Sequence, residues 1–217
     1  MESKYNFREL MKERHSCRKF QSKKIPEEVL KDIISISLMS PSWCNSQPWT
    51  IYVATGNTLE EIRKEWISKN KEKVKGYVDI NPGHRTDFSE RSQATMAKFF
   101  KIGDNLTNKN ELEESNADFF NAQAMVYLTL NKGHQPYSVL DLGGIEMAIM
   151  LAAKDHGVDS IPAYTTIMYP DVLRKYMKIS DKEDIVIGVA LGYEEKSPLN
   201  DLRSEKLTIE EACHFFN

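Results

Sequence analysis

The sequence contains little that would mark a secreted, membrane-spanning or disulfide-linked protein. Its 217 residues include only three cysteines, Cys17, Cys44 and Cys213, and this odd number without a CxxC pair argues against a disulfide framework and a cysteine zinc site. No apolar run approaches the roughly 18 to 20 residues of a membrane span, and residues 1–15 lack the apolar core of a signal peptide. We therefore expect a cytoplasmic protein that is not inserted in a membrane.

An excess of charge of one sign is also missing. The chain has 29 Lys and Arg against 32 Asp and Glu, which gives a formal net charge of −3 at pH 7. Binding to nucleic acid or to an anionic membrane surface generally requires an extended basic field. The composition therefore predicts neither partner, and any basic cluster must act locally.

Several common catalytic and binding motifs are absent as well. The sequence contains no GxGxxG, GxxxxGK[ST], HExxH or GxSxG pattern. The five histidines, His15, His84, His134, His156 and His214, share no spacing typical of metal ligands. These absences disfavour a standard nucleotide-binding loop, a metal hydrolase and a serine hydrolase, and we predict no metal site.

Helical and strand patterns alternate along the chain. Apolar residues Phe7, Leu10 and Met11 predict a first helix, and a second begins at Pro26 and extends to about Ser40. Strands are predicted at 49–55, 124–130, 159–164 and 184–193. We expect one domain over residues 1–217, with a charged helical excursion at about 57–122, interrupted at 81–83 and 105–116, and a C-terminal extension at about 194–217.

Residues 140–157 predict a helix that is apolar on nearly all sides. Gly144, Ala148 and Ala152 are spaced four apart, so one face presents only small side chains along which another backbone can approach. Tight packing inside one subunit would explain this pattern. A second explanation is that a partner subunit helps to bury the helix, because a chain of 217 residues has little structure of its own to surround it. We favour the second explanation and expect an obligate homodimer.

Three other stretches stand out by composition. RHSCRKF at 14–20 concentrates cations, and the tail carries Arg203 and Lys206, which either converge on this cluster or form a solvated charged strip. Thr208 and Glu211 in the tail have the form of a helical capping box. PSWCNSQPW at 41–49 combines stiff prolines with the amides of Asn45 and Gln47, and is either a rigid connector or a surface for the edges of a planar heterocycle.

Taken in order, the three stretches resemble the FMN-dependent nitroreductase family. Arg14, Ser16, Arg18 and Phe20 fit its R-x-S-x-[RK]-x-[FY] pattern, Pro41, Ser42, Asn45, Gln47, Pro48 and Trp49 fit its P-S-x-x-N-x-Q-P-W pattern, and Asn200 and Arg203 fit its late N-x-x-R pattern. The charged excursion and the segment FFNAQAMVYLTL resemble the nitrobenzoate-reductase-like branch. The resemblance implies an α+β three-layer sandwich with a mixed central sheet flanked by helices. It also implies an intertwined homodimer with FMN at the interface.

The resemblance also implies a role for each matched residue. Arg14, His15 and Ser16, together with Arg203, are expected to bind the FMN phosphate and its surroundings, with Lys206 as a further candidate. Arg18 is expected to face the pyrimidine edge of the flavin and to favour the reduced ring. Pro41, Ser42, Asn45 and Gln47 are expected to approach the cofactor from the partner subunit. In the segment 161–166, Ala163, Tyr164 and Thr165 are candidates to meet flavin N5, although Tyr164 departs from the small residues common in the family.

The implied activity is NAD(P)H-dependent reduction of nitroaromatic or quinone-like acceptors by a ping-pong hydride mechanism through flavin N5. No side chain is then needed as a general base. Cys17 and Cys44 occupy variable positions of the motifs and are expected to pack rather than to react. Aromatic residues of the excursion either line a lid for flat acceptors or form a small core; they are Trp66, Tyr77, Phe88, Phe99 and Phe100. The alternative function is a non-catalytic flavin-binding or flavin-supplying protein on the same fold.

Overall fold

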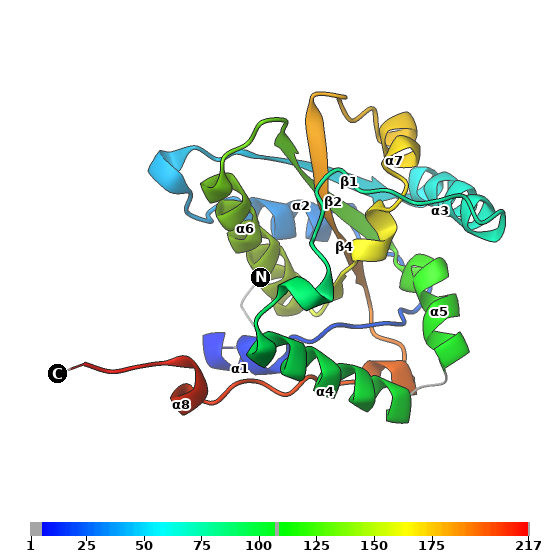
Figure 1. The fold of residues 1–217 in the computed structure, drawn as a ribbon. Helices are drawn as coiled ribbons and strands as arrows, with labels where there is room; N and C mark the ends of the chain where they lie inside the picture. Colours follow the sequence, from blue (N-terminus) through cyan, green and yellow to red (C-terminus); the bar gives the residue numbers. More distant parts are fainter. Residues whose placement is uncertain (1–5, 107–108, 217) are drawn as a thin grey trace.

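A four-stranded sheet forms the centre of the protein, with helices on both faces (Figure 1). The computed structural model describes residues 6–106 and 109–216. The sheet has the order β1-β2-β4-β3, and its strands are β1 (Trp49–Thr55), β2 (Ala124–Asn131), β3 (Asp159–Pro162) and β4 (Glu183–Gly192). The two central strands consist largely of buried residues, as their continuous apolar runs predicted.

The strand pairings confirm the α+β class but correct the expected mixed sheet. β1 pairs with β2 from Trp49 opposite Leu130 to Thr55 opposite Ala124, and this pairing is antiparallel. The β2–β4 and β3–β4 pairings are antiparallel too, with a register shift in β2 between Leu128 and Thr129. Within the described residues, the parallel contact that is recorded is an isolated bridge between Ser16 and Ser160. The mixed sheet was an expectation taken from the family resemblance alone. Periodicity within a strand does not show whether its neighbours run parallel or antiparallel to it, so the sequence offered no check on this expectation.

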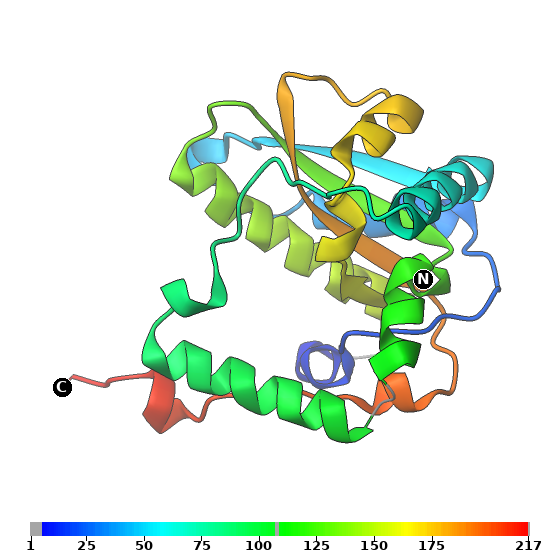
Figure 2. The same ribbon diagram turned by 45° about the vertical axis from the view of Figure 1, so that its right-hand side comes forward.

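Two separate hydrophobic clusters occupy the two faces of the sheet. On one face lie α2 (Glu27–Ser37) and α6 (Pro136–Asp155), whose apolar residues pack on the strands, and α1 (Phe7–Glu13) contacts α6. On the other face lie α3 (Gly56–Lys71), α7 (Pro170–Met177) and two short 3₁₀ helices, η3 (Phe119–Asn121) and η4 (Tyr164–Ile167). The result is the predicted three-layer arrangement of helices, sheet and helices (Figure 2).

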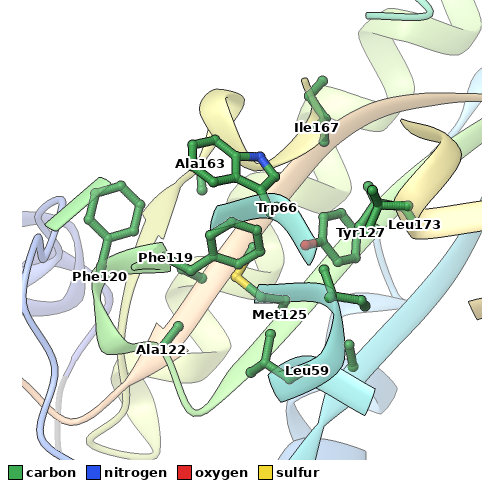
Figure 3. Close-up of a cluster of buried hydrophobic side chains, with 14 of the residues drawn as sticks. Leu59, Trp66, Phe119, Phe120, Ala122, Met125, Tyr127, Ala163, Ile167 and Leu173 are labelled. Carbon is green, nitrogen blue, oxygen red and sulfur yellow. The ribbon is translucent and has the colours of Figure 1, made fainter. Parts of the chain in front are cut away.

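The second cluster includes one of the excursion's aromatic residues. Trp66 of α3 is buried and makes edge contacts with Phe119 and Tyr169, at ring-centroid distances of 5.5 and 5.6 Å (Figure 3). Edge-to-face pairs of this kind add to the stabilisation from burial. Trp66 is therefore part of the main core and not of a lid.

The excursion extends from the sheet along the tail. The short helix η2 (Arg85–Asp87), α4 (Glu90–Leu106) and α5 (Lys109–Ala117) follow α3, and α4 lies beside the C-terminal segment (Figure 2). The interruption expected at 105–116 is wrong for the part that α5 occupies, and residues 107–108 lie outside the described residues. The tail contains η5 (Pro198–Asp201) and α8 (Ile209–Ala212), and the predicted capping box of Thr208 and Glu211 is present.

The helix α6 begins earlier than the sequence predicted and is exposed at its N-terminal part. Leu140 is 68% exposed, and a Cβ added at Gly143 or Gly144 would meet nothing within 4 Å. Packing inside the subunit therefore does not account for the small residues at this end, whereas Ala152 is buried.

By length and composition alone α6 also passes as a membrane span, contrary to the sequence expectation, although core helices of soluble folds pass the same test.

Candidate functional site

A cationic cavity of about 610 Å³ lies between the end of α1, α4 and the tail. The structure brings six residues singled out in the sequence to its lining: Arg14, His15, Ser16, Arg18, Arg203 and Lys206. Met11, Lys12, Phe99, Leu202 and Ser204 complete it. Five of these side chains are Lys or Arg and none of the described lining residues is acidic, so the cavity attracts anions.

The segment that carries these cations is fixed at both ends by backbone hydrogen bonds. α1 has a capping box between Asn6 and Glu9, and it ends at Arg14, whose N–H donates to the Leu10 carbonyl at 2.9 Å. Beyond the helix, Cys17 N–H donates to the Ser160 carbonyl at 3.0 Å. The segment therefore leaves α1 and runs beside the start of β3 without forming a full strand, and Arg14, Ser16 and Arg18 line the cavity while Cys17 is buried in the core.

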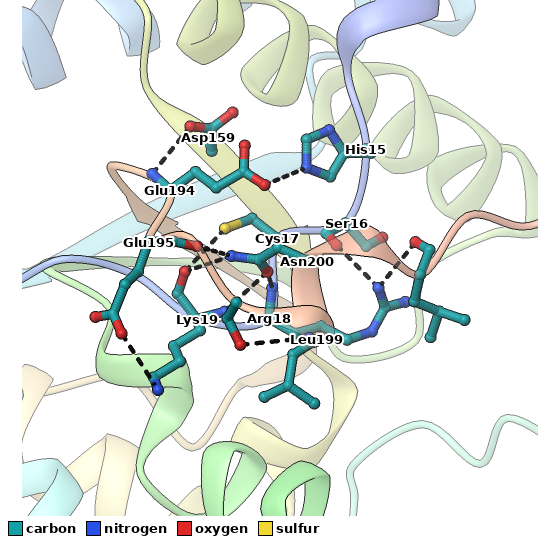
Figure 4. Close-up of polar contacts among 12 residues, drawn as sticks. His15, Ser16, Cys17, Arg18, Lys19, Asp159, Glu194, Glu195, Leu199 and Asn200 are labelled. Carbon is teal, nitrogen blue, oxygen red and sulfur yellow. Dashed lines mark hydrogen bonds and ion pairs between the residues drawn. The ribbon is translucent and has the colours of Figure 1, made fainter. Parts of the chain in front are cut away.

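Asn200 joins this segment to the tail through its buried side-chain amide (Figure 4). Its Oδ1 accepts from Arg18 N at 2.6 Å and from Lys19 N at 3.1 Å. Its Nδ2 donates to the carbonyls of Lys19 and Glu195, both at 2.8 Å. One amide thus satisfies four backbone groups from two distant parts of the chain, and it places Arg203, three residues later, beside the first cluster.

Arg18 is a buried cation without a carboxylate partner in the described part of the chain. Its side chain donates to the Ser16 carbonyl at 2.9 Å and to the Leu202 carbonyl at 3.5 Å, and it lies 5.8 Å from the Phe99 ring centroid. Burial, and then the nearby Arg203 cation, lower the pKa of the Arg18 guanidinium. An anion bound in the cavity would relieve both effects.

Arg14 and Arg203 also have donor groups available to a ligand. Arg14 Nε is buried, and no protein group among the described residues accepts a hydrogen bond from it. Arg203 donates to the backbone carbonyls of Asn200 and Leu202, and no carboxylate in the described chain pairs with it. Buried hydrogen-bond donors normally have an acceptor, so the lack of one at Arg14 Nε indicates that an oxygen of a bound ligand is its acceptor.

His15 lies at the edge of the same cavity and is linked to an acidic residue. Its Nε2 lies 3.2 Å from Glu194 Oε1, and its Nδ1 lies 2.9 Å from the Glu13 carbonyl. Glu194 N–H in turn donates to Asp159 (Figure 4), and Asp159 pairs with Lys154 of α6 at 2.9 Å. These contacts hold the His15 ring in place.

The loop 41–49 lies away from this cavity in the same subunit. Pro41, Asn45 and Gln47 are exposed, and none of them lines the cavity. Gln47 N–H donates to Ser42 Oγ at 2.9 Å and Gln47 Nε2 donates to Asn45 Oδ1 at 3.0 Å, so the loop supports itself. It is fastened to α6 by Trp43 N–H, which donates to Asp141 at 3.0 Å. The loop is therefore a rigid projection beside the exposed start of α6.

The candidate N5 segment lies at the end of β3. Ala163 is buried and its N–H donates to the Gly188 carbonyl at 2.7 Å, whereas Tyr164 is 40% exposed. Thr165 Oγ1 is buried without a hydrogen-bond partner in the described residues. Ile161, two residues before Ala163, lines a smaller cavity of about 210 Å³ that shares Arg18, Phe99 and Leu202 with the cationic cavity. The two cavities therefore lie side by side, one at the cations and the other at the sheet.

Comparison with known proteins assigns the chain to a family. Residues 11–193 match the Nitroreductase family. This chain belongs to the nitroreductase family. It is 27% identical over 223 residues to a chloronitrobenzene nitroreductase of Comamonas testosteroni, covering 95% of each chain. It is 25% identical over 216 residues to a 4-nitrobenzoate reductase of Pseudomonas putida, covering 97% of this chain and 95% of that protein.

Solved structures show the same nitroreductase fold. The FMN-dependent nitroreductase NfnB from Mycobacterium smegmatis, crystallised with NADPH, superposes with a TM-score of 0.89 over 97% of each chain, at 22% identity. The family and the fold predicted from the sequence are thus confirmed. The roles of individual site residues stay predictions.

Some lining residues of this nitroreductase-family site escaped the sequence reading. Lys12 follows from the position of α1, which has no local sequence signal for this role, and Met11 was singled out only as an apolar residue of the helix. Among the aromatic residues that were candidates for a lid, Phe99 and Phe100 line cavities, whereas Tyr77 and Phe88 line neither the cationic cavity nor the smaller one. Cys17 is buried as expected, whereas Cys44 is exposed within the single chain, so its expected packing stays a prediction.

Proposed function

We propose that this chain is an FMN-dependent oxidoreductase that uses NADPH or NADH to reduce nitroaromatic or quinone-like acceptors. The observation that carries the proposal is the cavity lined by five Lys and Arg side chains and no described acidic residue, with buried Arg14 Nε left without a protein acceptor. A phosphate monoester dianion is the kind of group that such a cavity binds. The family membership and the names of the relatives support the reaction class.

The residues present fit FMN, and we assign their roles as follows. Arg14, Ser16 and Arg203 bind the phosphate, with His15 and Lys206 beside them. Ala163, Tyr164 and Thr165 contact the flavin near N5, where the unpartnered Thr165 Oγ1 is an available hydrogen-bonding group. Bound FMN supplies the exchange of hydride between donor and acceptor.

Arg18 tunes the cofactor in this proposal. Arg18 lines both cavities, and its guanidinium forms no ion pair with the described residues, although Asp104 also lines the smaller cavity. A fixed cation in a buried site stabilises negative charge on a neighbouring ring more strongly than water does. We therefore expect Arg18 to raise the affinity for reduced flavin and to speed its formation.

The proposal includes a homodimer in which the loop 41–49 of each subunit serves the cofactor of the other. Within one chain, Pro41, Ser42, Asn45 and Gln47 lie away from the cations and beside exposed apolar residues. Met39 is 84% exposed and Trp43 61%, and Leu140 of α6 lies on the same side of the fold. Apolar surface of this extent favours burial against another subunit. Sedimentation at the mass of one 25.0 kDa chain with FMN bound would refute the homodimer.

The first experiment is the visible absorption spectrum of the purified protein, recorded without air before and after NADPH or NADH is added. We expect flavin bands that bleach with a donor and return when 4-nitrobenzoate or menadione is added. Steady-state donor oxidation that depends on the acceptor would then establish turnover. Flavin bands that no donor bleaches would contradict the enzyme assignment and favour a flavin carrier, and a protein that takes up no FMN would contradict both.

A further inference from the structure

A second large cavity, different from the smaller one at Ile161, lies beside the cationic cavity, between α4 and the tail. Its volume is about 430 Å³, and it shares Phe99, Ser204 and Lys206 with the first. The remaining lining residues are Arg91, Ala94, Thr95, Lys98, Ile102, Glu205, Leu207, Thr208 and Glu211. The second cavity therefore continues the first along α4, away from the sheet.

One face of α4 supplies half of this lining. Arg91, Thr95, Lys98 and Ile102 are spaced three or four residues apart, so their side chains lie along one side of the helix. This side faces residues 204–211 of the tail, which supply the hydroxyls of Ser204 and Thr208. Two cations from the helix and Lys206 from the tail thus face one space.

The two carboxylates in the lining neutralise these cations only in part. Glu211 accepts from Thr208 N–H at 2.8 Å, so its carboxylate is engaged in capping α8. Glu205 lies 4.0 Å from Lys98, and both side chains are about two-thirds exposed, which makes a weak pair. Arg91 donates to the backbone carbonyl of Glu211 at 2.8 Å and forms no ion pair with the described residues. Its remaining donors can therefore bind a ligand anion.

We propose that this second cavity binds the 2′-phosphate of NADPH, and that the enzyme consequently prefers NADPH to NADH. The inference rests on the proposed function, because it concerns the donor of that reaction. The two donors differ only at this position, where NADPH carries a phosphate dianion and NADH a neutral hydroxyl. Arg91 binds the dianion through forked, charge-assisted hydrogen bonds, assisted by Lys98 and the nearby hydroxyls. In this proposal the adenosine end of the donor lies in the cavity beside α4, which adjoins the cationic cavity, while the nicotinamide reaches the flavin.

The kinetic test compares kcat/KM for NADPH and NADH in the FMN-loaded wild type, in Arg91→Gln and in Lys101→Gln. We expect a wild-type preference for NADPH of about tenfold or more, and a loss of about tenfold in that preference in Arg91→Gln, mainly through KM for NADPH. Lys101 is the matched control, because it lies on α4, loses the same charge and is not among the residues that line this cavity. A preference that falls equally in both variants, or one that Arg91→Gln leaves unchanged, overturns the proposal.

A binding test makes the inference independent of turnover. Isothermal titration of the FMN-loaded protein with 2′,5′-ADP and with 5′-AMP should show at least about tenfold tighter binding of 2′,5′-ADP, lost in Arg91→Gln and kept in Lys101→Gln. Equal affinities for the two nucleotides overturn the proposal. Loss of FMN from Arg91→Gln also overturns it, because the cavity would then serve the flavin phosphate. If 2′,5′-ADP is selected but neither donor supports turnover, the site stands and the proposed function fails.

Discussion

Asp79 Oδ2 lies 2.7 Å from Arg174 Nη2, and this pair fastens the loop between α3 and α4 to the core. Both side chains are largely buried, and Asp79 also accepts from Ile185 N–H of β4 at 2.8 Å. Arg174 in turn donates to the Glu183 carbonyl at 2.7 Å. Nearby, Tyr77 N–H donates to the Met168 carbonyl at 2.9 Å, directly after η4. The loop that leads to α4 is thus anchored where the candidate N5 segment ends.

Replacing Asp79 should therefore destabilise the fold. Asp79→Asn keeps an oxygen for Ile185 N–H but leaves the Arg174 cation with only the exposed carboxylate of Asp181, 3.5 Å away, as counter-charge. We expect the free energy of unfolding in urea to fall by about 3 kcal/mol. Lys31→Gln breaks the exposed Glu27–Lys31 pair and is the control, for which we expect no measurable loss. Equal losses in the two variants would mean that the Asp79–Arg174 pair does not anchor the loop.

Asn200 should affect stability and cofactor binding together. Asn200→Ala removes four hydrogen bonds and takes these partners from the N–H groups of Arg18 and Lys19 and from the Glu195 carbonyl, whereas the Lys19 carbonyl still accepts from Glu195 N–H. We expect a loss of about 2 to 4 kcal/mol in unfolding free energy and a weaker Kd for FMN, because Arg203 loses its placement. Asn200→Asp keeps the acceptor for Arg18 and Lys19 and should lose less of both. An alanine variant with wild-type FMN affinity would separate Asn200 from the cavity.

Local patterns predicted most of the secondary structure. The bounds of β1 at 49–55 agree with the prediction, because an apolar run between turn residues is a strong local signal. α5 escaped it because KNELEESNA offers few apolar residues and packs by only part of its surface. The direction of strand pairing depends on which strands become neighbours, and no segment of the sequence records that.

The site was predictable where its residues share a motif. Arg14, Ser16 and Arg18 follow from one segment, and Arg203 joined them through the family pattern and its charge. The contribution of Lys12 and Phe99 depends on where α1 and α4 pack, which is set by tertiary contacts. The four hydrogen bonds of Asn200 depend on the meeting of two segments far apart in the sequence, so its motif position alone did not reveal its role.

The three arginines of the cationic cavity should have separable effects. Arg14→Ala and Arg203→Ala each remove a cation from the proposed phosphate site, and we expect each to weaken the Kd for FMN by about tenfold to a hundredfold. Arg18→Ala should instead lower the reduction potential of bound flavin or slow its reduction. Fluorescence titration with FMN and anaerobic redox titration measure the two effects. If all three variants keep the wild-type Kd and potential, the assignments are wrong.

The buried thiol of Cys17 contributes to the loss of folding stability at alkaline pH, and this contribution can be measured separately. Burial, as the largest cause, raises the pKa of the Cys17 thiol from 9.0 to about 12. The folded chain therefore keeps this proton where the unfolded chain has lost it, so the stability is fully present below pH 9 and declines as pH rises toward 12. The slope from this one group is at most about 1.4 kcal/mol per pH unit.

Urea unfolding across this range should show a shallower decline for Cys17→Ala than for the wild type. Other alkaline groups such as Tyr127, whose pKa burial also raises, contribute equally to both proteins and cancel in the comparison of slopes. Iodoacetamide provides a second readout, since the exposed Cys213 should react in the folded protein while Cys17 does not. Identical slopes in the two proteins, together with rapid alkylation of Cys17, would show that the thiol is in contact with solvent.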